Sequence, residues 1–187
     1  MSEKSIEISD NEIMQMFRNA DGREKAFTLL VKKYQERLYW HIRRILVSHD
    51  DTDDLLQNVF IKVWRHLDNF KQDSELFTWL YRIATNTSLT FLKEKKQSKG
   101  TYSLSDYDNY FENTIKAEKG FDIKKVEWKL QMAIHSLPEK QKLVFNLRYY
   151  DEMPYEKMSE VLETSVGALK ASYHFAAKKI EEYLNTN

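Results

Sequence analysis

The sequence predicts an all-α protein, in which two small helical domains are joined by a flexible linker. Apolar residues recur three and four positions apart along most of the chain, which is the period of an amphipathic helix. Only four Gly and two Pro interrupt the 187 residues. Periodicity weakens between two periodic halves, and a structureless connection of that length favours two domains over one. We therefore expect domains at 1–96 and 123–187, with the linker at 97–122.

The first two helices of the N-terminal domain are indicated by a cap and by an apolar stripe. Ser9 or Asp10 can cap a short first helix, because their side chains accept hydrogen bonds from the free N–H groups at a helix start. A longer helix is expected over 24–47, where apolar residues from Phe27 to Ile45 share one face.

The third helix follows a turn at 48–52 and should present two different faces. The stripe expected in the core is Leu56, Phe60, Val63 and Leu67. The stripe expected to face outward is Asp54, Gln57, Ile61 and Arg65. An exposed isoleucine among polar groups favours a protein-binding surface, with a solvated face as the alternative. The acidic run at 50–54 lacks the Gly and the closing Glu of a calcium loop, so we expect no metal there.

A polar loop at 68–75 leads to the fourth helix, which also has two chemically different faces. The residues expected in the core are Leu76, Leu80, Ile83, Thr87 and Phe91. Those on the other face are Trp79, Arg82, Asn86, Thr90 and Lys93, followed by Lys95, Lys96 and Lys99. An aromatic ring can stack on an unpaired base, and lysines can hold phosphates. We favour a single-strand binding face over the alternative of a half-buried tryptophan among surface polar groups.

The C-terminal domain ends in a helix-turn-helix pattern. A helix carrying Val126 to Ile134 is followed by one that Pro138 begins, and a short helix then opens at Pro154. After a tight turn, Ser165 caps a long last helix. The residues that this helix should bury are Val166, Leu169, Tyr173, Ala177, Ile180 and Leu184. The adjacent face is small and basic: Gly167, Lys170, Ala171, His174 and Lys178.

Composition excludes several classes of protein. The formal net charge is zero, with 29 basic and 29 acidic residues, so strong binding to DNA without a partner is not expected. There is no Cys, hence no disulfide or thiolate metal site. The N-terminus is polar and no apolar run is long enough to span a bilayer, which predicts a cytoplasmic protein. The five His are scattered and no Gly-rich phosphate loop occurs, so we expect no enzyme, no cofactor and no small-molecule substrate.

Two stretches resemble a known family. DDLLQNVFIKVWRHLDNF followed by FTWLYRIATNTSLTFLKEKK, at 53–70 and 77–96, closely resembles region 2 of group 4 (extracytoplasmic-function) sigma factors. LPEKQKLVFNLRYYDEMPYEKMSEVLETSVGALKASYHFAAKKIEEYL, at 137–184, resembles their region 4. The resemblance implies a region 2 bundle, a region 4 helix-turn-helix and a subunit that directs RNA polymerase to promoters.

The resemblance also implies roles for particular residues. Those implied to bind the clamp helices of the largest subunit of core RNA polymerase are Asp53, Asp54, Gln57, Asn58 and Ile61. Those implied to bind the single-stranded −10 element are Phe70, Phe77, Trp79, Arg82, Asn86, Lys93 and Lys96. Those implied to bind the −35 duplex are Arg148, Ser165, Gly167, Lys170, Ala171, His174 and Lys178.

The implied partners are core RNA polymerase (clamp helices and beta flap), promoter DNA and an anti-sigma factor.

Ser172 and Phe175 stand where family members often carry Arg, which weakens the expected binding to phosphates. The alternative function is a helix-turn-helix regulator that acts without polymerase. That alternative predicts tight duplex binding by the protein alone, and it leaves the basic and aromatic face of the fourth helix unexplained.

Overall fold

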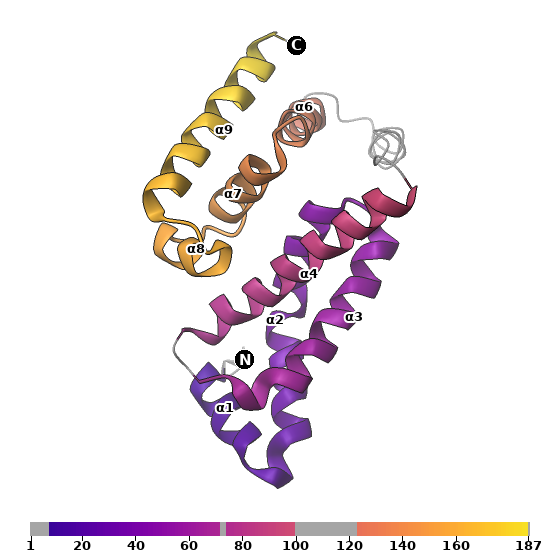
Figure 1. Ribbon diagram of the computed structural model, residues 1–187, viewed down its shortest axis with the longest axis vertical. Helices are drawn as coiled ribbons and strands as arrows, with labels where there is room; N and C mark the ends of the chain where they lie inside the picture. The colour runs from indigo at the N-terminus through magenta and orange to yellow at the C-terminus, as the bar shows by residue number, and fades with distance from the viewer. Residues whose placement is uncertain (1–7, 72–73, 100–122, 187) are drawn as a thin grey trace, which may run out of the picture.

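The computed structural model describes residues 8–71, 74–99 and 123–186, and every regular element in these ranges is helical (Figure 1). The N-terminal module holds α1 (Asp10–Arg18), α2 (Arg23–Leu46), α3 (His49–His66) and α4 (Leu76–Lys99), with 3₁₀ turns at Ala20–Gly22 and Leu67–Asn69. The C-terminal module holds α6 (Ile123–His135), α7 (Glu139–Tyr149), α8 (Tyr155–Leu162) and α9 (Val166–Thr186). The all-α prediction is confirmed. α4 runs past the predicted domain boundary at 96, and the rest of the predicted linker lies outside the described residues.

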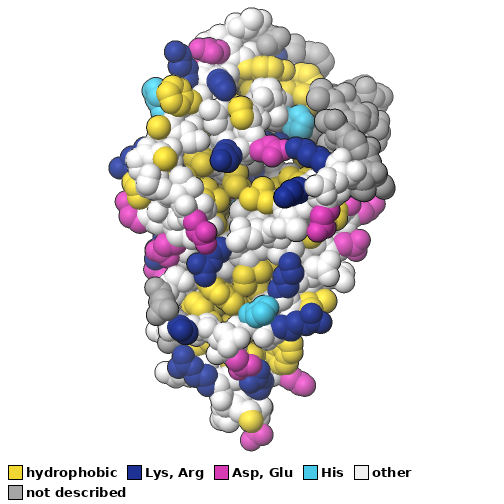
Figure 2. All heavy atoms as spheres, in the orientation of Figure 1, with side chains coloured by type: hydrophobic (Ala, Val, Ile, Leu, Met, Phe, Trp, Pro, Cys, Tyr) yellow, Lys and Arg dark blue, Asp and Glu magenta, His cyan; other side chains and the backbone are white. Residues whose placement is uncertain are grey.

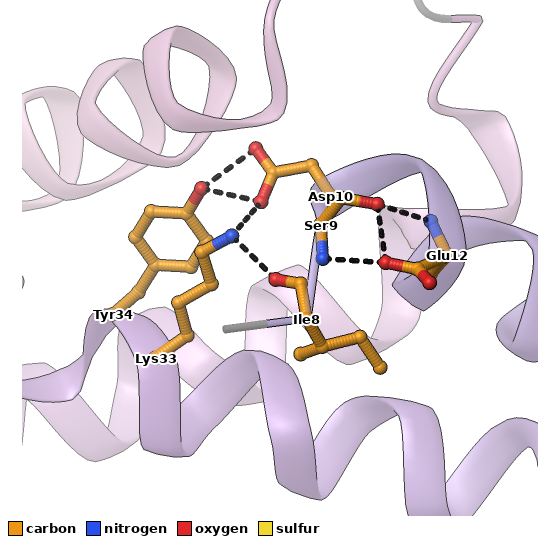
Figure 3. Close-up of polar contacts among 6 residues, drawn as sticks. All are labelled: Ile8, Ser9, Asp10, Glu12, Lys33 and Tyr34. Atoms are coloured by element: carbon orange, nitrogen blue, oxygen red, sulfur yellow. Dashed lines mark hydrogen bonds and ion pairs between the residues drawn. The ribbon is translucent and has the colours of Figure 1, made fainter. Parts of the chain in front are cut away.

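Ser9 caps α1, and Asp10, the first residue of this helix, ties it to α2. Ser9 is the cap: its hydroxyl accepts the Glu12 N–H at 3.2 Å, and the Glu12 carboxylate accepts the Ser9 N–H at 2.8 Å (Figure 3). Asp10, the alternative cap, instead accepts hydrogen bonds from Lys33 Nζ at 2.8 Å and from the Tyr34 hydroxyl at 2.7 Å. Burial and this hydrogen bond raise the pKa of Tyr34.

α3 begins earlier than the sequence predicted. The Ser48 hydroxyl accepts the Asp51 N–H at 3.3 Å, so the helix starts at His49, inside the expected turn. Asp50 and Asp51 then lie in the first turn, where the helix dipole favours carboxylates. Within the described ranges, no three His, Asp or Glu side chains gather as a metal site. None of the described helices is long and apolar enough to cross a membrane.

The core of the N-terminal module lies between α2, α3 and α4. Leu38 and Ile42 of α2 are fully buried. In α3 Val63 is buried as predicted, but in the first half of the helix Leu55 and Val59 are buried, and the predicted Leu56 and Phe60 are only partly buried beside them. Leu67 is buried as predicted. The outward stripe is exposed as expected at 54, 57, 61 and 65.

α4 is buried on more sides than its sequence indicates. Leu76, Leu80 and Thr87 are buried as predicted, whereas Ile83 and Phe91 are only half-buried. A further set of small, polar and aromatic residues is buried as well: Thr78, Tyr81, Ala84, Thr85 and Ser88. The cause is that α4 contacts α2 and α3 in its own module and also α8 of the other module.

In the C-terminal module α9 packs against α6, α7 and α8. Leu169 and Ile180 are buried as predicted, and Ala176 is buried in place of Ala177. The other expected core positions are half-buried: Val166, Tyr173, Ala177 and Leu184. At the end of α6, burial and then the nearby Lys142 ammonium lower the pKa of His135 to about 4.

The two modules pack against each other. α8 lies along α4, and α7 contacts α2 (Figure 1). Residues of both modules form one buried cluster, to which α8 and the turn before it contribute Met153, Met158 and Val161. The structure therefore places the C-terminal module directly on the N-terminal one.

Candidate polymerase and nucleic-acid interfaces

A shallow pocket lies between α3 and α4 on the face that the sequence assigned to single strands. Its volume is about 410 Å³, and its lining includes Trp79, Arg82 and Asn86. Figure 2 shows Lys and Arg side chains with a histidine around a hydrophobic patch in the lower half of the view. Trp79 and Arg82 are half-buried and Asn86 is exposed, so an aromatic surface, a guanidinium and an amide open to solvent together.

The structure adds three polar residues to this pocket that sequence reasoning missed: Lys62, His66 and Asn69. Lys62 Nζ donates a hydrogen bond to Thr87 Oγ1 at 3.2 Å, which ties α3 to α4 beside the pocket. Lys62 and His66 stand four positions apart on α3 and therefore share a face. That spacing was visible in the sequence, but the side of α3 that meets α4 was not.

Four of the predicted −10 residues do not line the pocket. Phe70 is 7% exposed, and its ring centroid lies 5.2 Å from that of Trp79, so the two rings pack together. Phe77 faces α2 instead, with its ring 4.3 Å from Tyr81 and 4.7 Å from the Arg37 guanidinium. Lys93 and Lys96 are exposed further along α4, where Lys96 forms an ion pair with Glu139 of α7.

The outward face of α3 presents a second surface. Asp54, Gln57 and Asn58 are exposed, and Ile61 keeps 48% of its surface in solvent. Asp53 lies at the edge, where its carboxylate is 3.0 Å from His49 Nδ1. The structure thus brings the five residues predicted to contact polymerase onto one helix face, acidic at its N-terminal end and apolar in its middle.

The third surface is the outer face of α9. Beside other exposed residues of α9, it exposes the small and basic set predicted from the sequence: Gly167, Lys170, Ala171, His174 and Lys178. Apart from its chain neighbours and the backbone of its own helix, no heavy atom lies within 4 Å of where a Cβ on Gly167 would be, so this part of the helix is open to close approach. Ser165 caps the helix through the Ala168 N–H at 3.3 Å. Phe175 is 54% exposed next to His174.

Arg148 supports this module from inside. Its guanidinium lies 5.3 Å from the Tyr155 ring and donates a hydrogen bond to the Met153 carbonyl at 3.3 Å. Lys170 Nζ lies 5.7 Å from the same ring. Arg148 is therefore used to hold the turn between α7 and α8, whereas Lys170 remains exposed on the outer face.

Comparison with known families covers both modules. The model of sigma-70 region 2 matches residues 30–98, and the model of sigma-70 region 4 matches residues 127–180. The RNA polymerase sigma-H factor of Pseudomonas aeruginosa is 30% identical over 170 residues, covering 87% of this chain and 88% of that protein. The chain belongs to the sigma-70 family.

Other relatives place it in the extracytoplasmic-function group. The ECF RNA polymerase sigma-E factor of Haemophilus influenzae is 29% identical, with 94% of this chain and 95% of that protein covered. The ECF RNA polymerase sigma factor SigW of Bacillus subtilis is 28% identical, with 87% and 91% covered. As a sigma factor, the protein binds core RNA polymerase and directs transcription initiation at promoter DNA; the helix-turn-helix regulator is not favoured.

Two solved structures share the fold. CnrH in complex with the cytosolic domain of CnrY superposes with a TM-score of 0.68 at 21% identity, over 95% of this chain and 99% of that one. The sigma factor RpoE in complex with the anti-sigma factor NepR from Bartonella quintana gives 0.67 at 18% identity, over 87% and 99%. In this sigma factor, the pocket beside Trp79 lies within region 2 and the outer face of α9 within region 4.

Proposed function

We propose that this sigma factor divides its work among three surfaces. The pocket between α3 and α4 reads the single-stranded −10 element, the outer face of α9 reads the −35 duplex, and the outward face of α3 docks on core polymerase. The observation that carries the proposal is the pocket beside Trp79, where an aromatic ring, an amide and several cations open together to solvent. These groups suit an unpaired base on a charged strand.

Within the pocket, Trp79 is the stacking platform. Phe70 packs against its ring, so little ordering is needed when a base stacks. Asn86 is exposed beside it and can bond a base edge, while Arg82 and Lys62 supply positive charge. Lys93 and Lys96 extend the path for phosphates along α4. Phe77 acts indirectly by packing α4 on α2.

On α9, Gly167 and Ala171 allow the helix to approach the major groove, where Lys170, His174 and Lys178 meet phosphates or base edges. Phe175 supplies exposed apolar surface of the kind that contacts a thymine methyl group. Arg148 positions the turn that precedes α8, and Ser165 fixes the start of α9.

On α3, the exposed residues Asp54, Gln57, Asn58 and Ile61, with Asp53 at the edge, form the surface for the clamp helices of the largest polymerase subunit. An apolar residue surrounded by polar ones is typical of a protein interface. The beta flap is the expected polymerase contact of the C-terminal module. The protein acts in the cytoplasm as a specificity subunit, without a reaction of its own.

An anti-sigma factor is the proposed regulatory partner. RpoE of Bartonella quintana is bound to the anti-sigma factor NepR, and CnrH is bound to the cytosolic domain of CnrY. The shared fold supports an equivalent partner for this sigma factor.

Run-off transcription tests the proposal. Purified bacterial core polymerase is given a library of promoter DNA with and without the protein, and specific transcripts are expected only when it is added. Their sequences would define both promoter elements. Tight duplex binding by the protein alone, with no transcripts, would contradict the proposal and favour the helix-turn-helix regulator.

A further inference from the structure

The surface between the two modules is built as a specific contact. Met158 and Val161 of α8 and Met153 of the preceding turn are at most 1% exposed and belong to the same cluster as the core of α2 and α4. Leu143 and Leu147 of α7 join that cluster. Removing apolar side chains of this size from water stabilises the arrangement that buries them. The closed arrangement therefore has a substantial hydrophobic basis.

A polar cluster at this surface is made of one residue from the C-terminal module and three from the N-terminal module. The Asp151 side chain, in the turn between α7 and α8, is only 6% exposed. Its Oδ1 accepts hydrogen bonds from Arg44 Nη1 at 3.1 Å and from the Tyr81 hydroxyl at 3.2 Å. Its Oδ2 lies 3.4 Å from His41 Nδ1. We call these four residues the Asp151 cluster.

On the N-terminal side of the cluster, His41 also has partners within its own module. His41 is 1% exposed, and its Nε2 is hydrogen-bonded to Thr85 Oγ1 at 2.8 Å. The rings of His41 and Tyr81 lie 4.7 Å apart. Because a buried ion pair is costly to break by removing one partner, Asp151 has far more effect on closure than the exposed pairs at the edge. Those pairs are Lys157 with Glu75, and Lys96 with Glu139.

Closure hides neither of the proposed reading faces. Asn86 and Lys93 are exposed on α4, and Lys170 and His174 are exposed on α9. Closure does set the distance between the −10 reading face on α4 and the −35 reading face on α9. α8 contacts both α4 and α9, and a helix is about 10 Å across, so the faces lie within a few helix diameters. The −35 and −10 elements are about 25 base pairs apart, or about 85 Å along B-form DNA.

We propose that the Asp151 cluster is a latch that holds the free sigma factor closed, and that Asp151 must leave Arg44, Tyr81 and His41 before both promoter elements are engaged at once. This inference rests on the reading faces proposed above. In the closed state each face remains competent for its own element. Binding to core polymerase supplies the free energy that separates the modules. Promoter choice therefore depends on the polymerase although Asn86, Lys170 and His174 are already exposed in the closed state.

The latch itself is tested without DNA. The chain has no native Cys, so Cys at Arg18 of α1 and Glu181 of α9, both exposed, can carry a fluorescent donor and acceptor. Asp151→Ala should shift the closed–open equilibrium by about 100-fold toward the open state, since it leaves buried groups unpaired, and energy transfer should fall. Tyr81→Phe removes one hydrogen bond and should give a shift of about 5-fold.

Glu156→Ala is the matched control, because it removes an exposed carboxylate from the same module. It should leave energy transfer unchanged. Circular dichroism of each variant shows whether the helices are retained. If helical Asp151→Ala transfers energy as well as the unsubstituted protein, the latch is excluded.

Promoter engagement is tested by locking the modules together. Lys157 Nζ lies 2.9 Å from Glu75 Oε1 across the interface, so the double variant Glu75→Cys, Lys157→Cys can be joined by a short bis-maleimide with a disulfide spacer. The locked protein should bind a −35 duplex as before. With core polymerase it should give at least about 10-fold fewer transcripts, and cleavage of the spacer should restore them.

Equal transcription by the locked and the cleaved protein would overturn the requirement for opening. If neither the cleaved protein nor the unsubstituted protein gave transcripts, the proposed reading faces would be wrong. The energy-transfer result would then still decide whether Asp151 is a latch.

Discussion

The two sides of α4 differ in what they meet and in how well the sequence reveals them. One side exposes Trp79, Arg82 and Asn86 around the pocket, and this side is chemically distinctive in the sequence. The other side buries the apolar Leu80 and Ala84, and it buries Tyr81 and Thr85 just as completely. Thr85 finds its partner across the helix packing, where its Oγ1 lies 2.8 Å from His41 Nε2. Polar character alone therefore does not tell a binding face from a packing face.

The largest difference between the two sides should appear in stability. Tyr81→Ala removes a fully buried ring that contacts Phe77 and His41, and should lower the free energy of unfolding by about 3–5 kcal/mol. Trp79→Ala, on the half-buried side, should cost clearly less. Urea denaturation followed by circular dichroism measures both. Equal losses of unfolding free energy in the two variants would show that both sides of α4 contribute alike to stability.

For promoter opening, the pocket side of α4 should matter more than the buried side. Trp79→Ala should reduce opening about 10- to 100-fold, because one stacked base is worth about 1–3 kcal/mol. Permanganate reactivity of thymines in the −10 element reports the unpaired strand. His66→Gln, at the rim of the same pocket, serves as a comparison in which the platform is kept. Unchanged permanganate reactivity in Trp79→Ala would remove the stacking role.

The pH dependence of stability should report on the core of the C-terminal module rather than on the interface with α4. His135 follows Ile134, which belongs to a second buried cluster with Phe145 and Ile180. Its pKa, about 4 when folded, lies below the ordinary value of 6.5, so the unfolded chain binds more protons between these values. Stability should fall as pH drops from about 6.5 toward 4, by about 1 kcal/mol after allowance for solvent screening. Urea unfolding at pH 7 and pH 5 measures this, and His135→Asn should flatten the response. A slope that His135→Asn leaves intact would contradict this assignment.

The smallest effect concerns the outer face of α9. Gly167→Ala meets open space and should stabilise the helix by up to about 0.5–1 kcal/mol. If the helix approaches DNA closely at this position, affinity for a −35 duplex should nevertheless fall. Thermal unfolding and fluorescence anisotropy measure the two quantities. A variant that gains stability and keeps its duplex affinity would place Gly167 outside the contact.

Much of the fold could be predicted because the apolar spacing and the caps are local signals. Ser9 and Ser165 cap helices through their own hydroxyl groups, and such contacts depend only on neighbours in the chain. In the first half of α3 the core stripe was displaced by one position, to Leu55 and Val59. Leu55 and Leu56 are equally apolar, so only the packing of α2 and α4 decides which of them is buried.

The candidate site could be predicted only in part, because local signals group residues of one helix but not residues of two helices. The pocket residues on α4 share a helix face and could be grouped from the sequence, whereas Lys62 and His66 come from α3 and meet them only in the fold. The closed arrangement depends on Asp151, which stands 107 positions from Arg44. A turn residue gives no local sign of a partner that distant.

The most direct test of the separate surfaces compares Asn86→Ala with Gln57→Ala. Both residues are exposed, so each change should alter stability by less than about 0.5 kcal/mol. Affinity for core polymerase and permanganate reactivity of the −10 element are measured for both. We expect Asn86→Ala to lose opening and keep its affinity for polymerase, and Gln57→Ala to lose that affinity while opening is normal at saturating protein. Loss of both properties together in either variant would contradict the assignment of separate surfaces.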